Sequence, residues 1–173
     1  MNQAVAMRAD RSGISSAAAA RLIAFLLPAA LLAGAFGSQY LGGLIPCEMC
    51  WWQREAHMVA LVMAALAFTA PAGSSRCRMF VLLAALGIAA SGIIGVYHAG
   101  VEAKIFQGFT TCTALPKAAS TAELLKQIPQ APLVRCDEVQ WSFLGISMAG
   151  WNAILSLGGA ALILLLTLRA RRA

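Results

Sequence analysis

The sequence predicts an all-α integral membrane protein, built as a bundle of four transmembrane helices with a short first and a long second outer loop. The first observation is composition: 60% of the 173 residues are hydrophobic and only 12% are charged. Soluble domains are roughly half apolar and about a quarter charged. The second observation is that four apolar stretches each approach the ~20 residues that cross a bilayer. The third is an uneven distribution of basic residues, which orients the bundle.

The four predicted spans cover about residues 21–45, 51–70, 79–98 and 149–168. The first has the basic start of a secretory signal, but a signal's apolar region is only ~7–15 residues, so we expect it to stay as an anchor. Residues 1–20 are then a mobile N-terminal arm, 21–168 a single domain and 169–173 a short tail. In the third span, Gly87, Ser91 and Gly95 recur every four residues, which predicts close helix packing.

Basic residues predict that both termini are cytoplasmic, because cytoplasmic ends and short cytoplasmic loops are rich in Lys and Arg. In this orientation eight of the thirteen basic residues lie inside: Arg8, Arg11, Arg21, Arg76, Arg78, Arg169, Arg171 and Arg172. All acidic residues except Asp10 lie outside. The net charge of +6 is therefore a sign of topology, and we expect no binding to nucleic acid.

The same orientation sorts the five cysteines. Cys47, Cys50, Cys112 and Cys136 face the outer, oxidising side, and Cys77 faces the cytosol. Disulfides persist on an oxidising side and are rare in the cytosol. The pattern predicts two exchangeable thiol pairs, with Cys77 a reduced residue without a role.

Cys47 and Cys50 form a Cys-x-x-Cys pair at the start of the second span, a spacing used for redox work or for metal. The free backbone N–H groups of a first helical turn favour a thiolate at Cys50. Arg54 lies one turn deeper on the same face. It could stabilise that thiolate and bind the oxygen of an electron acceptor, or it could merely extend to the interface.

Cys112 and Cys136 lie in the long outer loop, about residues 99–148. Alone, they would suggest a structural disulfide that stabilises by ~3 kcal/mol. Beside a second pair they suggest a thiol–disulfide relay. Zinc would need four ligands, usually from two short Cys-x-x-Cys units. Since only one such unit is present, we expect no metal.

Three further features have open interpretations. His98, at the outer end of the third span, could deliver protons from the surface or be hydrogen-bonded at the interface. A capping-box pattern predicts a short amphipathic helix at 121–127. The apolar run at 141–146 could lie in the membrane interface or lead directly into the fourth span. We assign no role to Glu55 or His57.

The element Cys47-Glu48-Met49-Cys50-Trp51-Trp52-Gln53-Arg54, four spans, and Cys112 with Cys136-Asp137 in the second outer loop resemble the bacterial disulfide bond formation protein B family. The resemblance extends from about Arg21 to Leu168. It implies a quinone-linked protein-disulfide oxidoreductase of the bacterial inner membrane, with its redox loops in the periplasm. Such an enzyme reoxidises a periplasmic thioredoxin-like dithiol oxidase (DsbA-like) and passes the electrons to the membrane's ubiquinone or menaquinone.

The resemblance also implies residue roles. Cys112 is the sulfur that the partner attacks, Cys136 is its mate, and Cys47 with Cys50 is the quinone-proximal pair. Arg54 belongs to the quinone site, and His98 matches only by its place. Two alternatives remain: a quinone–thiol redox protein like vitamin K epoxide reductases, whose Cys-x-x-Cys usually comes late in the chain, and a scaffold with structural disulfides.

Overall fold

The computed structural model describes residues 2–108, 120 and 135–172, with side chains from residue 15 onward. Its helices are α1 (Asn2–Tyr40), α2 (Glu48–Ala67), α3 (Ser75–Glu102) and α5 (Met148–Arg172). Two short strands, β1 (Ser142–Phe143) and β2 (Ile146–Ser147), precede α5. The predicted helix at 121–127 and Cys112 lie outside the described residues.

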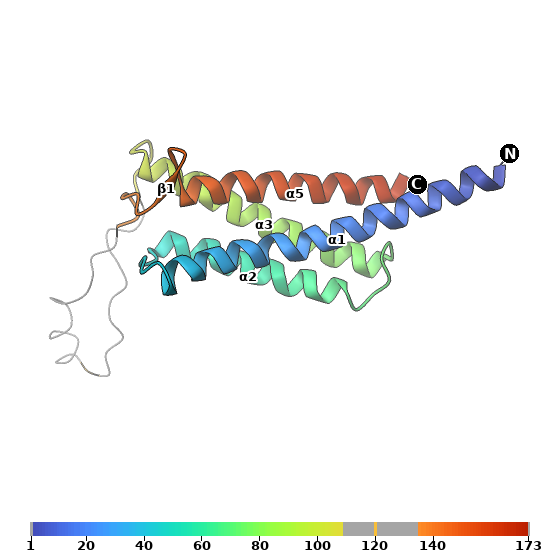
Figure 1. Ribbon diagram of the computed structural model, residues 1–173, viewed down its shortest axis with the longest axis horizontal. Helices are drawn as coiled ribbons and strands as arrows, with labels where there is room; N and C mark the ends of the chain where they lie inside the picture. Colours follow the sequence, from blue (N-terminus) through green and yellow to red (C-terminus); the bar gives the residue numbers. More distant parts are fainter. Residues whose placement is uncertain (1, 109–119, 121–134, 173) are drawn as a thin grey trace.

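The four helices lie side by side as one elongated bundle (Figure 1). α3 packs against both α2 and α5, and α1 packs against α2 and α5. The start of α1, the end of α5 and the α2–α3 turn lie at one end of the bundle. The α1–α2 connection, the end of α3 and the β1–β2 hairpin gather at the other end, which we call the hairpin end.

Small residues bring α3 close to both of its neighbours. A Cβ added at Gly87 would meet the Ala56 backbone oxygen at 3.2 Å, and one at Gly95 would meet the Ala149 oxygen at 3.0 Å. Such separations are at the limit of van der Waals contact. The predicted close packing through Gly87 and Gly95 is therefore confirmed, and Asn152 of α5 contacts Gln53 of α2 and Ser91 of α3.

The first helix differs from the prediction at both ends. α1 begins at Asn2, so it continues through the segment expected to be a mobile arm. It ends at Tyr40 rather than near residue 45, because Gly42 and Gly43 follow and Gly43 has a φ of +69°, a conformation that ends helices. The remaining residues to Cys47 form the short connection that carries the cysteine pair to the start of α2.

Within the described residues, three helices are long and apolar enough to cross a membrane: Ser15–Tyr40, Ser75–Glu102 and Met148–Arg171. α2 is a fourth helix of 20 residues packed among them. It is not among these three, and its first two turns carry Glu48, Arg54 and Glu55. The four predicted helices thus exist, and the one outside the group of three carries Cys50 and Arg54.

The run at 141–146 neither continues into α5 nor forms a helix. Ser142 pairs with Ser147 and Phe143 with Ile146 in a two-stranded hairpin. Leu144 and Gly145 turn it with φ values of 52° and 76°, the signature of a tight hairpin turn. The Trp151 indole donates to the Phe143 carbonyl at 3.1 Å, which fixes the hairpin on the first turn of α5.

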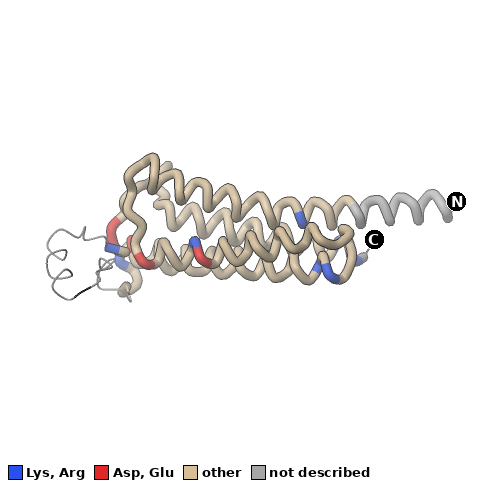
Figure 2. The backbone as a smooth tube through the Cα atoms, turned by 90° about the horizontal axis from the view of Figure 1, so that it is seen from below, with Lys and Arg blue, Asp and Glu red and all other residues tan. Residues whose placement is uncertain are grey.

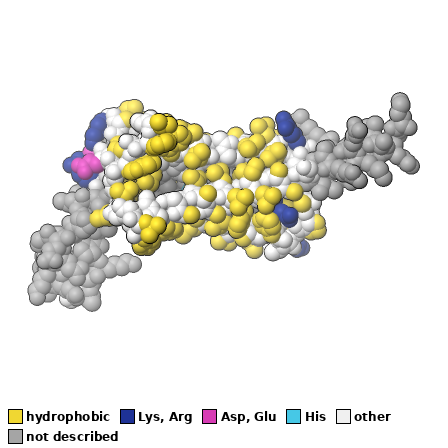
Figure 3. Space-filling view, in the orientation of Figure 1, with side chains coloured by type: hydrophobic (Ala, Val, Ile, Leu, Met, Phe, Trp, Pro, Cys, Tyr) yellow, Lys and Arg dark blue, Asp and Glu magenta, His cyan; other side chains and the backbone are white. Residues whose placement is uncertain are grey.

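The outer surface and the ends fit a membrane protein. Large apolar side chains face outward along the helices, among them Leu26, Leu86, Ile93 and Leu165. Figure 3 shows apolar side chains spread over the middle of the visible face, with Lys and Arg near the ends. Figure 2 shows acidic residues toward the hairpin end, whereas among the described side chains the opposite end carries basic residues.

Candidate active site

The Cys47–Cys50 pair lies where α2 begins. Cys47 is the N-cap residue of α2, and its sulfur accepts the backbone N–H of Cys50 at 3.3 Å. The two sulfurs lie 2.9 Å apart, which compares with ~2.05 Å in a disulfide bond. The pair can therefore close or open without movement of the helix. This is the geometry expected from the Cys-x-x-Cys spacing.

Cys136 reaches the same point from the segment before the hairpin. Its sulfur, the Cys47 sulfur and a ring nitrogen of His98 all lie within 4.8 Å of one another. Met49 and Val101 pack around the cluster, and Cys47 and Cys136 are both buried. The structure therefore brings together three of the predicted residues that lie up to 89 positions apart in the sequence.

The environment of Cys47 disfavours its thiolate. Contacts with the sulfurs of Cys136 and Cys50, together with burial, raise the pKa of the Cys47 thiol well above its ordinary range. A neutral thiol is the stable reduced form of this residue. Any step that releases Cys47 as a thiolate therefore needs a hydrogen-bond donor beside it.

Arg54 is buried one turn below Cys50. Its guanidinium donates to the Gln39 side-chain oxygen and, at 2.9 Å, to the Ala35 carbonyl of α1. It also lies 5.0 Å from the centre of the Phe36 ring and 5.1 Å from that of Trp51, as cation–π contacts require. A side chain held in this way, at 6% exposure, lies inside the protein, which favours a role in the site over a merely snorkelling arginine.

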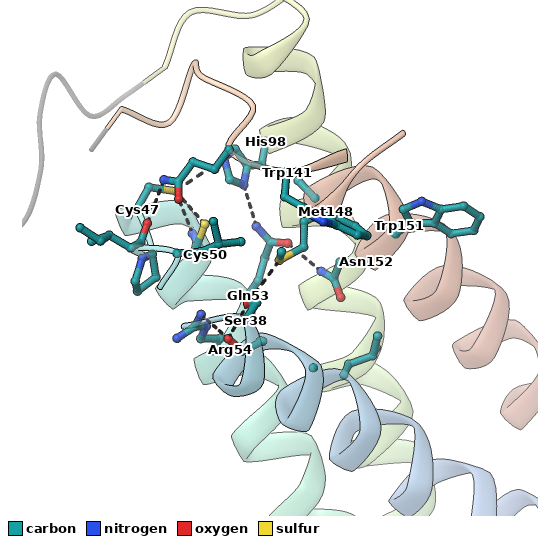
Figure 4. Close-up of a pocket in the computed structure, with 18 of the residues that line it drawn as sticks. Ser38, Cys47, Cys50, Gln53, Arg54, His98, Trp141, Met148, Trp151 and Asn152 are labelled. Carbon is teal, nitrogen blue, oxygen red and sulfur yellow. Dashed lines mark hydrogen bonds between the residues drawn. The ribbon is translucent and has the colours of Figure 1, made fainter. Parts of the chain in front are cut away.

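A cavity of about 550 Å³ connects these groups. It lies between α1, α2, α5 and the segment before the hairpin, and Leu31, Ile45 and Trp141 contribute to its mainly apolar wall. Its polar wall comes from residues of α2, α3 and α5, of which Figure 4 labels Cys50, Gln53, Arg54, His98 and Asn152. An apolar cavity with a few convergent polar groups is the usual form of a small-molecule site.

A chain of buried polar side chains passes behind the cysteines. Gln53 contacts the His98 Nδ1 at 2.9 Å and accepts from the Asn152 amide at 2.8 Å. Asn152 in turn contacts the His57 ring at 2.9 Å. Gln53, His57 and His98 are each at most 7% exposed. Polar groups so deep in an apolar bundle are expensive and usually functional.

His98 is buried rather than at the surface, and of the two interpretations offered by the sequence the hydrogen-bonded one agrees with its contacts. The histidine is 3% exposed, with Cys136 and Glu102 beside its ring. It lies 3.6 Å from the Cys47 sulfur and 3.9 Å from a Glu102 oxygen. A part in proton delivery stays a prediction. Sequence reasoning missed Gln53, His57, Glu102 and Asn152. The available signal was polarity inside a predicted span or at its end.

The remaining predicted cysteines have different positions. Cys77 is buried near the start of α3, at the end of the bundle opposite the hairpin, as expected for a residue apart from the other pairs. Cys112 lies outside the described residues, so its pairing with Cys136 stays a prediction.

Within the described part of the chain, one group of three potential metal ligands is found here, Cys47, His98 and Cys136. A structural zinc site uses four protein ligands. Among the described residues the set is one ligand short, and the prediction of no metal stays a prediction.

The segment that carries Cys136 is fixed to the end of α3 by charge. Lys104 donates to an Asp137 carboxylate oxygen at 2.6 Å and to the Asp137 carbonyl at 2.7 Å. Arg135 donates two bonds of 2.8 Å to the same carboxylate. The Arg135 and Lys104 cations hold the pKa of the Asp137 carboxyl well below its usual range. Asp137 therefore remains ionised at neutral pH and keeps its neighbour Cys136 beside Cys47.

Comparisons with known proteins agree with this arrangement. The family model described as disulfide bond formation protein DsbB matches residues 17–166. A "Disulfide bond formation protein B" of Shewanella sp. strain MR-4 is 33% identical over 141 residues, covering 79% of this chain and 78% of its own. One from Methylococcus capsulatus is 32% identical over 167 residues, covering 88% and 94%.

A "Disulfide bond formation protein B 2" of Pseudomonas aeruginosa is 32% identical over 123 residues, covering 68% of this chain and 70% of its own. No solved structure matches. The family model covers most of the chain, including α2, α3 and the Cys136 segment. This decides between the family alternatives drawn from the sequence: the chain is a multi-pass membrane protein that belongs to the DsbB family of disulfide bond formation proteins.

Proposed function

We propose that the protein is a quinone-dependent thiol oxidoreductase that reoxidises a periplasmic thioredoxin-like dithiol oxidase (DsbA-like). The observation that carries this proposal is the line of groups at the hairpin end. Cys136, Cys47 and Cys50 follow one another in contact, and Cys50 borders the cavity that Arg54 also lines. Electrons from the partner would enter this line at Cys136 and leave it at Cys50, beside the cavity.

The contacts of Cys136, Cys47 and Cys50 support the inner exchange steps, and the steps of Cys112 rest on the family resemblance. A partner thiolate attacks Cys112 in a Cys112–Cys136 disulfide, and Cys136 leaves as a thiolate. Cys136 then attacks Cys47 in the Cys47–Cys50 disulfide, and Cys50 leaves as a thiolate. The partner's second thiolate resolves the mixed disulfide, so the partner leaves oxidised and Cys112 is released.

The outer pair is then restored. Cys112 attacks Cys136 in the Cys47–Cys136 disulfide, which re-forms the Cys112–Cys136 bond and releases Cys47 as a thiolate. The net result is one oxidised partner and a reduced Cys47–Cys50 pair. Two electrons have moved from the partner to the cavity's edge.

The cavity has the features that a quinone ring needs. Its wall is mainly apolar, and Arg54 supplies a buried cation with five N–H donors, two of which bond to Gln39 and Ala35. Its other donors could bind a carbonyl oxygen. A bound quinone would supply the acceptor for the two electrons and two protons of the dithiol. Arg54 would hold and polarise the acceptor, and His98 lies beside Cys47.

The proposal places the protein in the bacterial inner membrane with both termini in the cytoplasm. The support is the distribution of Lys and Arg, because the end with the termini carries basic residues such as Arg76, Arg78 and Arg169. The hairpin end then faces the periplasm, where disulfides persist. A soluble dithiol partner could reach the outer loop there.

Quinone reduction by the purified protein tests the proposal. With a reduced thioredoxin-like dithiol protein as donor, wild type should reduce ubiquinone or menaquinone analogues. Cys77→Ser should do so at the wild-type rate, since Cys77 lies at the opposite end of the bundle. Cys136→Ser should lose turnover, because it removes the link between partner and Cys47. Full turnover in Cys136→Ser, or none in wild type with either quinone, would contradict the proposal.

A further inference from the structure

In the chain of polar side chains beside the cysteines, each hydrogen bond fixes which atom of the next side chain donates and which accepts. These side chains form a continuous path from α5 to the Cys47 sulfur: Asn152, Gln53 and His98 (Figure 4). Each member contacts the next at 2.8–2.9 Å, and His98 contacts Cys47 at 3.6 Å. Gln53 and His98 are buried, and Asn152 is half-buried at the edge of the cavity.

Two backbone carbonyls fix the orientation of the two amides. The Gln53 Nε2 lies 3.1 Å from the Met49 carbonyl oxygen, and the Asn152 Nδ2 lies 3.2 Å from the Ser91 carbonyl oxygen. A carbonyl only accepts hydrogen bonds, so a nitrogen must occupy each of these positions. The Asn152 amide then donates to the Gln53 oxygen, and the Gln53 amide donates to the His98 Nδ1.

The Gln53 amide, as a donor to Nδ1, allows only one tautomer of neutral His98. Its Nδ1 accepts from Gln53, so the ring proton is on Nε2. Among the described residues the surroundings of Nε2 agree, since the Cys47 sulfur at 3.6 Å and Glu102 Oε1 at 3.9 Å can both accept. The donor Gln53 faces Nδ1, and the acceptors Cys47 and Glu102 face Nε2.

We propose that Gln53 and Asn152 are positioning residues that hold His98 as its Nε2–H tautomer, so that its N–H is directed at the Cys47 sulfur whenever that sulfur leaves as a thiolate. This inference deepens the proposed function and rests on it for the step that it serves. The tautomer itself depends only on the contacts above.

The step is the attack of Cys112 on the Cys47–Cys136 disulfide. The bond between Cys112 and Cys136 forms, the bond between Cys136 and Cys47 breaks, and the electron pair stays on Cys47. Burial and the neighbouring sulfurs oppose charge on Cys47, as its raised pKa indicates. A fixed N–H donor at the sulfur stabilises the thiolate, whereas the other tautomer would present a lone pair and repel it.

Three other titratable groups face the ring. Cys47 and Cys136 approach from the connections that precede α2 and the hairpin, and Glu102 lies one turn further along α3. Glu102 and the Cys136 backbone compete with Cys47 for the Nε2 proton. The Glu102 oxygen lies farther from Nε2, at 3.9 Å, than the Cys47 sulfur at 3.6 Å.

Nitrogen-15 NMR of protein labelled at histidine tests the tautomer directly, because the chain has only two histidines. In wild type without quinone, His98 should be protonated at Nε2 alone. In Gln53→Glu at mildly alkaline pH, an ionised carboxylate replaces the donor, and His98 should become protonated at Nδ1. Ser156→Ala is the matched control. It removes a contact of Asn152 with α5, but both amides keep their carbonyl partners, so the His98 signals should not move.

A wild-type His98 protonated at Nδ1 would overturn the inference, as would unchanged His98 nitrogens in Gln53→Glu. The wild-type spectrum alone is decisive if the variant does not fold. Neither spectrum involves quinone or partner, so failure here is distinguishable from failure of the proposed function.

The reactivity of Cys47 gives the second readout. In reduced, quinone-free protein, modification of Cys47 by methyl methanethiosulfonate can be followed over time by peptide mass spectrometry. Gln53→Met should lower the modification rate at a fixed, mildly alkaline pH by about tenfold, the size of one charge-assisted hydrogen bond. Ser156→Ala should keep the wild-type rate. An unchanged rate in Gln53→Met would mean that the Gln53 donor does not control Cys47.

Discussion

At the scale of single residues, Arg54 separates binding of the electron acceptor from sulfur chemistry. Exchange between cysteine pairs needs no quinone, so Arg54→Met should leave attack by the partner nearly normal. Reoxidation should slow, mostly through a raised KM for quinone, because a cation and hydrogen-bond donor is gone. A charge-assisted bond of ~1.5–3 kcal/mol corresponds to about one to two decades. Steady-state kinetics with limiting quinone measures this.

The matched control for this substitution is Arg21→Met. Arg21 also stacks on an aromatic ring, with its guanidinium 4.5 Å from the centre of Phe68, and donates to the Ala70 carbonyl at 3.2 Å. It lies outside the cavity lining, and its contact with Ala70 places it beside the α2–α3 turn, at the opposite end of the bundle. It should cost stability without changing the KM for quinone. Arg54→Lys should be intermediate, since it keeps the charge and loses the planar fork. Wild-type kinetics in Arg54→Met would place the quinone site elsewhere.

Local spacing explains which residues of the site could be placed from the sequence, and long-range packing explains which could not. The Cys-x-x-Cys pair and Arg54 share one helical turn, so local spacing was enough to place them together. His98 was misplaced because its burial depends on a loop from a distant part of the chain. In the sequence, nothing about Gln53 or Asn152 alone indicates a role in the site. Their role emerges only where α2, α3 and α5 meet.

At the scale of elements, the close contact of α3 with α5 should be sensitive to added volume. At Gly95 a new Cβ would meet the Ala149 oxygen at 3.0 Å and the Ala153 nitrogen at 3.1 Å, both backbone atoms that cannot move alone. Gly95→Ala should therefore lower stability by about 1–3 kcal/mol. Thermal unfolding in detergent measures the loss.

Gly158→Ala provides the control for that substitution. Gly158 lies in α5 with nothing within 4 Å of an added Cβ. Alanine there should be neutral or stabilising by up to ~1 kcal/mol, because it favours the helix. Equal unfolding temperatures for the two variants would mean that α3 and α5 are not packed as closely as described.

The charged contact beside Cys136 predicts a pH dependence. The pKa of Asp137 is lowered in the folded protein, so the ionised carboxylate favours the ordered segment above its ordinary pKa. That contribution is lost as the pH falls through the folded value. At neutral pH, Asp137→Asn should increase hydrogen exchange around residues 135–140 and slow transfer from Cys136 to Cys47.

Glu138→Gln is the comparison for Asp137→Asn. Glu138 lies 3.7 Å from the Arg135 Nε and is 63% exposed, so its pair is weak. It should change exchange in the segment much less. Equal protection in wild type and Asp137→Asn would show that the Lys104 and Arg135 contacts do not hold Cys136 in place.

At the scale of the whole molecule, the bundle separates its charges along its length, and composition alone anticipated the membrane class. The helix α2 was predicted as readily as the others because its charged residues lie in its first two turns and an apolar run follows them. The hairpin before α5 was not predicted. Its apolar residues would fit an interfacial segment equally well. Only the positive φ angles at Leu144 and Gly145 distinguish the hairpin from such a segment.

Orientation is the remaining prediction at this scale. The start of α1 and the end of α5 lie at the same end of the bundle, where Arg76, Arg78, Arg169 and Arg171 gather. Basic residues beside short connections favour the cytoplasm. A green fluorescent protein fused after Ala173 should therefore fluoresce, and an alkaline phosphatase fused there should be inactive, since that enzyme needs export to form its disulfides. A fusion after Gly108 should give the reverse, because it follows α3 at the hairpin end. Active phosphatase after Ala173 would place the cysteine cluster in the reducing cytosol, where the proposed relay could not rest in its oxidised form.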